Sequence, residues 1–176
     1  MKELEIVHYP NPILLSVGKP IHDSEFGTHF EVTVETMFAV MEKAGGVGLA
    51  APQVGISKRF FVMDIPEESE KGRDRERHVL INPEIISVEG EQVGEEGCLS
   101  FPGLYQTIKR DMRVIVKAQN QHGGKIELDL DGLAARCILH ETDHCDGIVF
   151  LDRMTPLKRE LAKRKIKRLQ QTGKWE

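Results

Sequence analysis

Two histidines and a glutamate lie close together in the run His140-Glu141-Thr142-Asp143-His144. Helical residues four apart face the same way, so His140 and His144 can offer their imidazoles to one metal ion. Glu141 would then lie beside that ion, close enough to take a proton from an activated water molecule. The alternative is a helix with two surface histidines, but the apolar run at 137–139 favours a buried helix. The spacing therefore predicts the metal-binding helix of a metallohydrolase.

A catalytic metal usually has three protein ligands, and this helix supplies two of them. A longer zinc-peptidase pattern would place the third histidine at position 150, where this chain has Phe150, and no histidine follows His144. Cys98 is the strongest upstream candidate, because Gly97 beside it lets the backbone approach a site closely. A lone cysteine is more often a small buried apolar residue, but the missing ligand outweighs that interpretation here.

A loop rich in small residues, GVGLAAPQ at 46–53, offers another polar group. Its pattern imitates a dinucleotide-binding loop, but a predicted helix precedes it where that motif requires a strand. The helix that should follow the motif has no room before the next predicted strand, which begins near residue 59. We interpret the loop as a wall that lets a substrate backbone approach, with the Gln53 amide donating to a polarised oxygen.

Hydrophobic periodicity predicts the elements that must position these groups. Helices are expected at 26–44, 133–147 and about 156–171, and strands at 59–65, 79–85, 85–93, 112–119 and 125–130. The last two strands are joined by NQHGG, which is typical of a hairpin, whereas the charged segment 66–78 is expected to be an exposed loop. We predict an α+β fold in which antiparallel β-sheets pack around a central HExxH-bearing helix, with a C-terminal helix.

Length and cysteine content limit the class of protein. The 176 residues contain no repeat or low-complexity linker, so we expect one catalytic domain over 1–176. Three cysteines fit a reducing compartment better than a disulfide framework. The N-terminus lacks a secretory pattern and no apolar run is long enough for a membrane span, so we expect a cytoplasmic, bacterial protein with no membrane partner.

Charge is divided unevenly along the chain. Segment 153–174 contains nine Lys and Arg against one Glu, a net +8, whereas the remainder carries −12. A basic C-terminal helix on an acidic body could meet a polyanion, although a solvated helix face is the alternative interpretation.

Three segments, in this order along the chain, together resemble the peptide deformylase family. They are GVGLAAPQ at 46–53, EGCLS at 96–100 and HETDH at 140–144, and the resemblance extends over nearly the whole chain. It implies hydrolysis of the N-formyl group of nascent peptides that begin with formylmethionine, with release of formate. Cys98, His140 and His144 would hold one divalent ion, in the first place Fe²⁺, with Zn²⁺, Ni²⁺ and Co²⁺ as alternatives.

The resemblance also implies a role for each site residue. A metal-bound water or hydroxide would attack the formyl carbon, and Glu141 would carry its proton to the leaving amine. The Gln53 side chain and the Leu99 backbone N–H would stabilise the oxyanion. The peptide would lie extended between Val47-Gly48 and Gly97, and the basic C-terminal helix would dock on the ribosome. The methionine side chain would enter a pocket made by Val47, Leu133, the alkyl stem of Arg136, Cys137 and His140.

Some positions depart from the family pattern. Leu139 stands where Gln is frequent, which predicts a changed contact behind the metal ligands, and Cys145 replaces a frequent Leu. Tyr105 replaces a frequent Arg at the pocket mouth, where it would alter peptide preference. Asp143 is expected to orient the site from behind, paired with Arg110.

Two other functions remain open from the residues alone. A HExxH zinc endopeptidase that cuts internal peptide bonds would not need Cys98 as a ligand. A non-enzymatic RNA- or ribosome-binding module with a purely structural metal would not need Glu141. An acid placed to act on water, with an amide donor opposite, favours an open catalytic site over a closed structural one.

Overall fold

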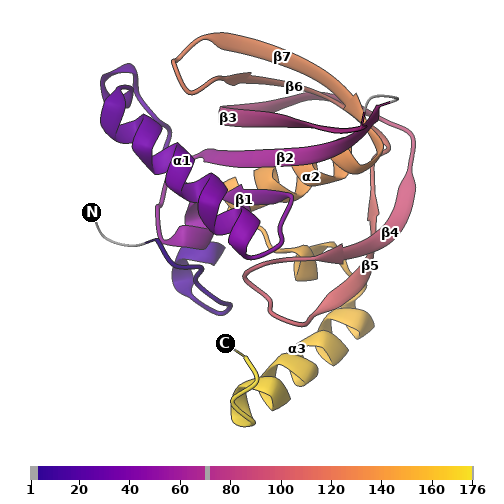
Figure 1. The fold of residues 1–176 in the computed structure, drawn as a ribbon. Helices are drawn as coiled ribbons and strands as arrows, with labels where there is room; N and C mark the ends of the chain where they lie inside the picture. The colour runs from indigo at the N-terminus through magenta and orange to yellow at the C-terminus, as the bar shows by residue number, and fades with distance from the viewer. Residues whose placement is uncertain (1–3, 70–71, 176) are drawn as a thin grey trace.

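The computed structural model describes residues 4–69 and 72–175, and within them the chain forms two antiparallel sheets and three α-helices (Figure 1). The larger sheet has the strand order β1-β2-β3-β6-β7, and β4 pairs with β5 in the smaller one. The strands are β1 Gly48–Ala50, β2 Phe60–Ser69, β3 Gly72–Glu89, β4 Gln92–Gly97, β5 Tyr105–Arg110, β6 Arg113–Gln119 and β7 Lys125–Asp131. The α-helices are α1 Thr28–Lys43, α2 Gly132–Cys145 and α3 Pro156–Gln171, and the short 3-10 helices are η1 Pro12–Leu15, η2 Asp23–Glu25, η3 Ala51–Val54 and η4 Phe150–Arg153.

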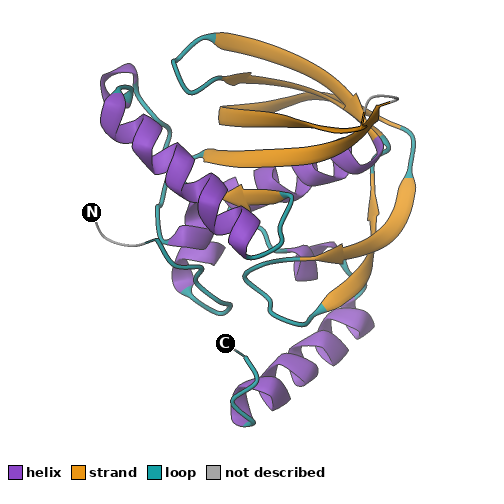
Figure 2. Cartoon of the chain, in the orientation of Figure 1, coloured by secondary structure: helices purple, strands orange, loops and turns teal. Residues whose placement is uncertain are grey.

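Residues 60–65 of β2 are buried on both faces of the strand, because α1 and α2 cover opposite sides of the larger sheet (Figure 2). Side chains alternate along a strand, so Phe60 and Val62 pack in the core that contains α1. Phe61 and Met63 point the other way, into the core that contains Ile138 of α2. The helix that carries the HETDH run is therefore held against the sheet by an apolar face.

A third core joins α3 to the rest of the chain. It contains Leu14 of η1, Phe101 and Leu104 of the β4–β5 connection, Phe150 of η4, Ile166 of α3 and Trp175. This core lies beside the residues that follow Cys98, so α3 is anchored close to one predicted metal ligand. Among the described residues, no helix has the length and apolar character that crossing a membrane requires.

Most predicted elements are confirmed, including the α+β class, all three α-helices and the 112–119 and 125–130 hairpin. The predicted exposed loop at 66–78 is wrong, because β2 continues to Ser69 and β3 begins at Gly72. The two strands stay paired out to that end, so backbone groups satisfy one another even where the side chains are charged. Residues 70–71 of that segment lie outside the described part.

The small-residue segment 46–53 is also more regular than the predicted loop. Gly48–Ala50 forms strand β1, which pairs with β2, and residues 51–54 form η3. Three residues are too few for hydrophobic alternation to predict a strand. This strand forms because β2 offers its backbone groups for pairing on the side opposite β3.

Gly147 permits the sharp turn that follows the metal-binding helix. Its φ is +70°, and an added Cβ would lie 2.8 Å from the Ser16 carbonyl carbon. Gly173 follows the end of α3 with a similar φ of +64°, but an added Cβ there meets nothing within 4 Å.

Gly173→Ala should therefore show the effect of backbone strain alone and lower the free energy of unfolding by about 1 kcal/mol. Gly147→Ala adds a steric clash and should lower the free energy of unfolding by about 2–4 kcal/mol. Equal losses in urea denaturation would contradict the close packing at Gly147.

Candidate active site

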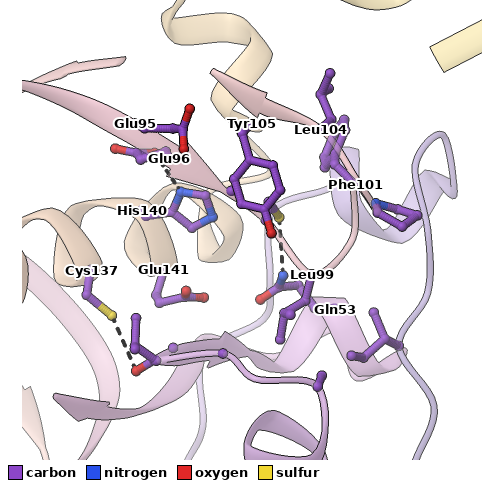
Figure 3. Close-up of a pocket in the computed structure, with 18 of the residues that line it drawn as sticks. Gln53, Glu95, Glu96, Leu99, Phe101, Leu104, Tyr105, Cys137, His140 and Glu141 are labelled. Atoms are coloured by element: carbon purple, nitrogen blue, oxygen red, sulfur yellow. Dashed lines mark hydrogen bonds and ion pairs between the residues drawn. The ribbon is translucent and has the colours of Figure 1, made fainter. Parts of the chain in front are cut away.

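A pocket of about 490 Å³ opens between β1, β4 and α2, a size that suits a small ligand or the end of a peptide (Figure 3). The structure brings the predicted residues together here, although their roles stay predictions. Those that line the pocket are Val47, Gly48, Gln53, Gly97, Cys98, Leu99, Leu133, Arg136, Cys137, His140 and Glu141. His144 lies behind them, almost fully buried.

Cys98, His140 and His144 form a cluster that could hold a metal ion. One ligand atom from each lies within 4.8 Å of the others, and Cys98 Sγ is 3.2 Å from His144 Nε2. Ligand atoms around a tetrahedral ion would be roughly 3.4–3.6 Å apart, so small adjustments are sufficient for binding. Three protein ligands leave a coordination position for water or substrate, which is typical of a catalytic site.

Electrostatics and burial also fit a cation at this cluster. Burial lowers the pKa of His144 well below its usual value, which keeps a neutral imidazole available as a ligand. Burial raises the pKa of Glu141 to about 7. Among the described residues, Glu141 Oε2 and His144 Nδ1 are buried atoms without a protein hydrogen-bond partner. The unpaired Glu141 oxygen is an acceptor in the pocket beside the three ligand atoms, and such a buried site is chemically incomplete without a bound ion or water. His144 Nδ1 is the nitrogen that carries the proton when Nε2, the atom near Cys98 Sγ, is the ligand.

Glu96 fixes the orientation of the His140 ring. Its carboxylate accepts hydrogen bonds from His140 Nδ1 at 2.9 Å, from Arg110 Nε at 2.8 Å and from Arg136 Nη1 at 2.8 Å. Burial favours a neutral carboxyl, but the bonds from His140 and Arg110 lower the pKa of Glu96 far below its usual value. Because the ionised carboxylate accepts a hydrogen bond from the protonated Nδ1, His140 Nε2 is left free to bind a metal.

Asp143 continues this buried ionic network on the other side of α2. It accepts from Arg110 Nη1 at 2.6 Å and from Arg153 Nε at 3.0 Å. The expected pair between Asp143 and Arg110 is therefore confirmed. Arg153 belongs to η4, so the network links the metal-binding helix both to β5 and to the segment that leads into α3.

Gln53 is held with its amide nitrogen toward the metal cluster. Its Oε1 accepts the Ala50 N–H at 2.8 Å, which assigns the oxygen to the backbone side. Its Nε2 then lies 3.4 Å from Cys98 Sγ, on the pocket side. Gln53 is 1% exposed, so this orientation does not depend on solvent. The amide can donate to an oxygen that develops negative charge in the pocket.

Two glycines let the backbone approach the reactive groups. An added Cβ at Gly48 would lie 2.6 Å from both Cys137 Sγ and Glu141 Oε1. An added Cβ at Gly97 would lie 2.6 Å from the Tyr105 ring. A side chain at either position would fill the pocket wall, which explains glycine at these two places in β1 and β4.

The positions that depart from the family pattern have structural explanations. Leu139 packs against the apolar core under α2, and Cys145 is fully buried in that core, away from the metal cluster. Burial raises the pKa of the Cys145 thiol, which makes it a poor ligand and nucleophile. Tyr105 lines the pocket and is 59% exposed, as expected of a residue at its mouth.

Sequence reasoning missed the roles of Glu96 and Arg153 and the contribution of the N-terminal segment. Ile6 and His8 line the pocket although they are ninety residues from the other lining groups of β4. Alternation along β4 could have indicated that Glu96 faces inward. No local pattern indicates its partners, because they come from β5 and α2.

A model of the polypeptide deformylase family matches residues 3–160. The chain belongs to the polypeptide deformylase family. Membership makes it an enzyme, a hydrolase of protein biosynthesis, and deformylation of nascent peptides is the activity of that family. The comparisons favour neither the endopeptidase nor the non-enzymatic alternative.

Individual relatives agree over nearly the full length. The chain is 45% identical to a peptide deformylase of Acidobacterium capsulatum, with 97% of each chain covered. It is 47% identical to one of Chromobacterium violaceum, with 96% of each covered. A crystal structure of a peptide deformylase from Legionella pneumophila, 39% identical, superposes with a TM-score of 0.85 over 98% of each chain.

Arg110 is the shared partner of two buried carboxylates, so its loss should be costly. Arg110→Ala removes the positive charge that is paired with both Glu96 and Asp143. This loss should lower the free energy of unfolding by about 3 kcal/mol, measured by urea denaturation. Arg113→Ala is the matched control, because Arg113 makes a similar two-point pair with Asp129 in solvent. The control should change stability little. Similar stability of the two variants would show that the buried network contributes nothing.

Proposed function

We propose that this chain hydrolyses the N-formyl amide of peptides that begin with formylmethionine and releases formate. The observation that carries the proposal is one arrangement in an open pocket. The Glu141 carboxylate lies beside the cluster of Cys98, His140 and His144, and the Gln53 amide is directed to the same space. The family assignment supports the reaction, and this geometry supports the role of each residue. Residues 1–176 act as one catalytic domain.

Cys98, His140 and His144 hold one divalent ion, with Fe²⁺ proposed first and Zn²⁺, Ni²⁺ or Co²⁺ as alternatives. A thiolate with two imidazoles is a donor set that suits each of these ions. When bound, the ion supplies Lewis-acid activation of a water molecule and of the formyl oxygen. Glu96 keeps the His140 Nε2 lone pair directed at it.

Glu141 moves the proton. Its carboxylate accepts a proton as water adds to the formyl carbon and delivers that proton to the amine that leaves. Burial of this side chain, which is 4% exposed, keeps bulk water from exchanging the proton during the step. Gln53 Nε2 and the Leu99 backbone N–H donate to the formyl oxygen as negative charge develops on it.

The peptide lies extended between β1 and β4. Val47 and Gly48 border the pocket on one side and Gly97 on the other, and the two glycines have no side chain to keep a peptide backbone away. The methionine side chain enters a pocket made by Val47, Leu133, the alkyl stem of Arg136, Cys137 and His140. The Arg136 head group is already bonded to Glu96 and to the Ile108 carbonyl, which leaves its stem as the apolar part that faces the pocket.

The bacterial cytoplasm is the proposed compartment. Cys98, Cys137 and Cys145 are all free thiols, as a reducing environment allows, and Cys98 can act as a ligand only while it is unoxidised. The named bacterial relatives support the same assignment.

Glu141→Gln tests the proposed chemistry. The amide keeps the size of the side chain but cannot accept the proton, so formate release from a formyl-Met peptide should fall by at least about 100-fold. Metal content, measured in the same sample, should stay that of the wild type. Glu127→Gln on the exposed strand β7 is the matched control and should keep full activity. Wild-type rates in Glu141→Gln would exclude the proton-carrying role.

The ribosome is the second proposed partner, through the exposed basic side chains of α3. Lys158, Lys163, Arg164, Lys165, Lys167 and Arg168 are charged, whereas Ala162 and Ile166 face the core. Phosphate contacts would make such binding strongly dependent on salt.

Charge reversal on α3 tests this partner. Changing Lys163, Arg164 and Lys167 together to Glu should reduce co-sedimentation with ribosomes by roughly 10-fold or more at low salt. A matched triple change of Lys109, Lys117 and Lys125 to Glu alters net charge equally and should leave co-sedimentation unchanged. The proposal fails if the α3 variant still co-sediments like the wild type.

A further inference from the structure

The chain contains a single tryptophan, Trp175, and it is buried after the end of α3. Lys174 N–H donates to the Leu169 carbonyl and Gly173 N–H to that of Gln170, so the chain reverses after the helix. Trp175 Nε1 then donates to the Tyr9 carbonyl at 2.8 Å. The end of the chain is thereby tied by a directional bond to its beginning.

The segment around Tyr9 connects two parts of the active site. Val7 N–H donates to the Gln53 carbonyl at 2.8 Å, and Tyr9 N–H donates to the Ser100 carbonyl at 3.0 Å. Gln53 carries the amide that faces the metal cluster, and Ser100 lies two residues after Cys98. The segment therefore sets the distance between η3, which carries Gln53, and the loop that carries Cys98.

The Trp175 ring also contacts the loop that carries Cys98. It meets the Phe101 ring edge-on, with centroids 6.0 Å apart, and Phe101 stacks on Tyr9 at 4.9 Å. Phe101 N–H donates to the Cys98 carbonyl at 2.8 Å, so the turn that ends in Phe101 holds the ligand directly. On its other side Phe101 packs against Phe150 at 4.9 Å.

We propose that Trp175 is a positioning residue for the active site, acting through Tyr9 and Phe101. It fixes the loop of Cys98 relative to Gln53 and, through Phe150, whose ring centroid lies 6.2 Å from that of His140, relative to α2. It thereby limits how far the thiolate moves from the two histidines. The inference rests on the metal and catalytic roles proposed above. Trp175 lies beyond residues 3–160 that the family model matches, so the family assignment does not supply this role.

A purely apolar anchor for α3 would not need this geometry. Ala162 and Ile166 already bury the apolar side of that helix. The Trp175 N–H instead satisfies a backbone carbonyl whose own residue donates to Ser100, which orients the segment as well as covering it. If Trp175 positions the site in this way, its loss should change metal-ion retention and kcat by more than the loss of stability alone explains.

The test compares Trp175→Ala and Trp175→Phe with Phe30→Ala. Phe30 is buried in the α1 core and does not line the pocket, and its removal should cost a similar amount of stability. The readouts are the rate at which Co²⁺-loaded protein loses the ion to a chelator, the Cys98 thiolate–Co²⁺ absorption band, and kcat and KM for a formyl-Met peptide.

Trp175→Ala should release Co²⁺ faster and lower kcat, each by roughly 3- to 10-fold, with a smaller change in KM. Trp175→Phe keeps a ring against Phe101 but lacks the N–H, so both values should lie between Trp175→Ala and the wild type. Phe30→Ala should lower the melting temperature while Co²⁺ release and kcat stay near wild type.

The proposal is overturned if Trp175→Ala retains wild-type Co²⁺ release and kcat, or if Phe30→Ala changes them equally. Failure of the deformylase function is a separate result, because wild-type protein would then release no formate. The comparison of Co²⁺ release among the variants would still decide the role of Trp175.

Discussion

A single buried carboxylate, Glu96, connects the ionic core of this protein to its metal-binding helix. It accepts hydrogen bonds from Arg110 Nε at 2.8 Å, Arg136 Nη1 at 2.8 Å and His140 Nδ1 at 2.9 Å, and all of these side chains are buried. Removing a charge from water is costly, and such a network is stable only when each member keeps its partners. The same bonds that make burial tolerable also set the tautomer and direction of His140.

This constraint explains why the two sheets and α2 must meet as they do. Glu96 lies on β4, Arg110 on β5 and His140 on α2, so the network forms only when the smaller sheet pairs in register and the helix docks beside it. Asp143 extends the network to Arg153 and thus toward α3. Fold stability and metal-site geometry consequently depend on the same set of charges, and stability measurements on this network also report on the site.

The sequence predicted what depends on local pattern. Helical spacing predicted the helix that carries His140. The missing third ligand then indicated Cys98, more than forty residues away, because few residue types can bind a metal ion. Prediction failed at 66–78, where charged residues form strands because a partner strand satisfies their backbone. The partners of Glu96 and the place of Trp175 could not be predicted, because they depend on contacts between elements that no local period encodes.

We propose that Cys98, His140, His144 and Glu141 together form the site that hydrolyses a formyl amide. The most direct measurement is formate release from a formyl-Met peptide by protein purified without oxygen, with the metal content determined in the same sample. We expect a bound divalent ion and formate equal in amount to the free amine produced. Iron- or nickel-loaded protein that releases no formate would contradict it.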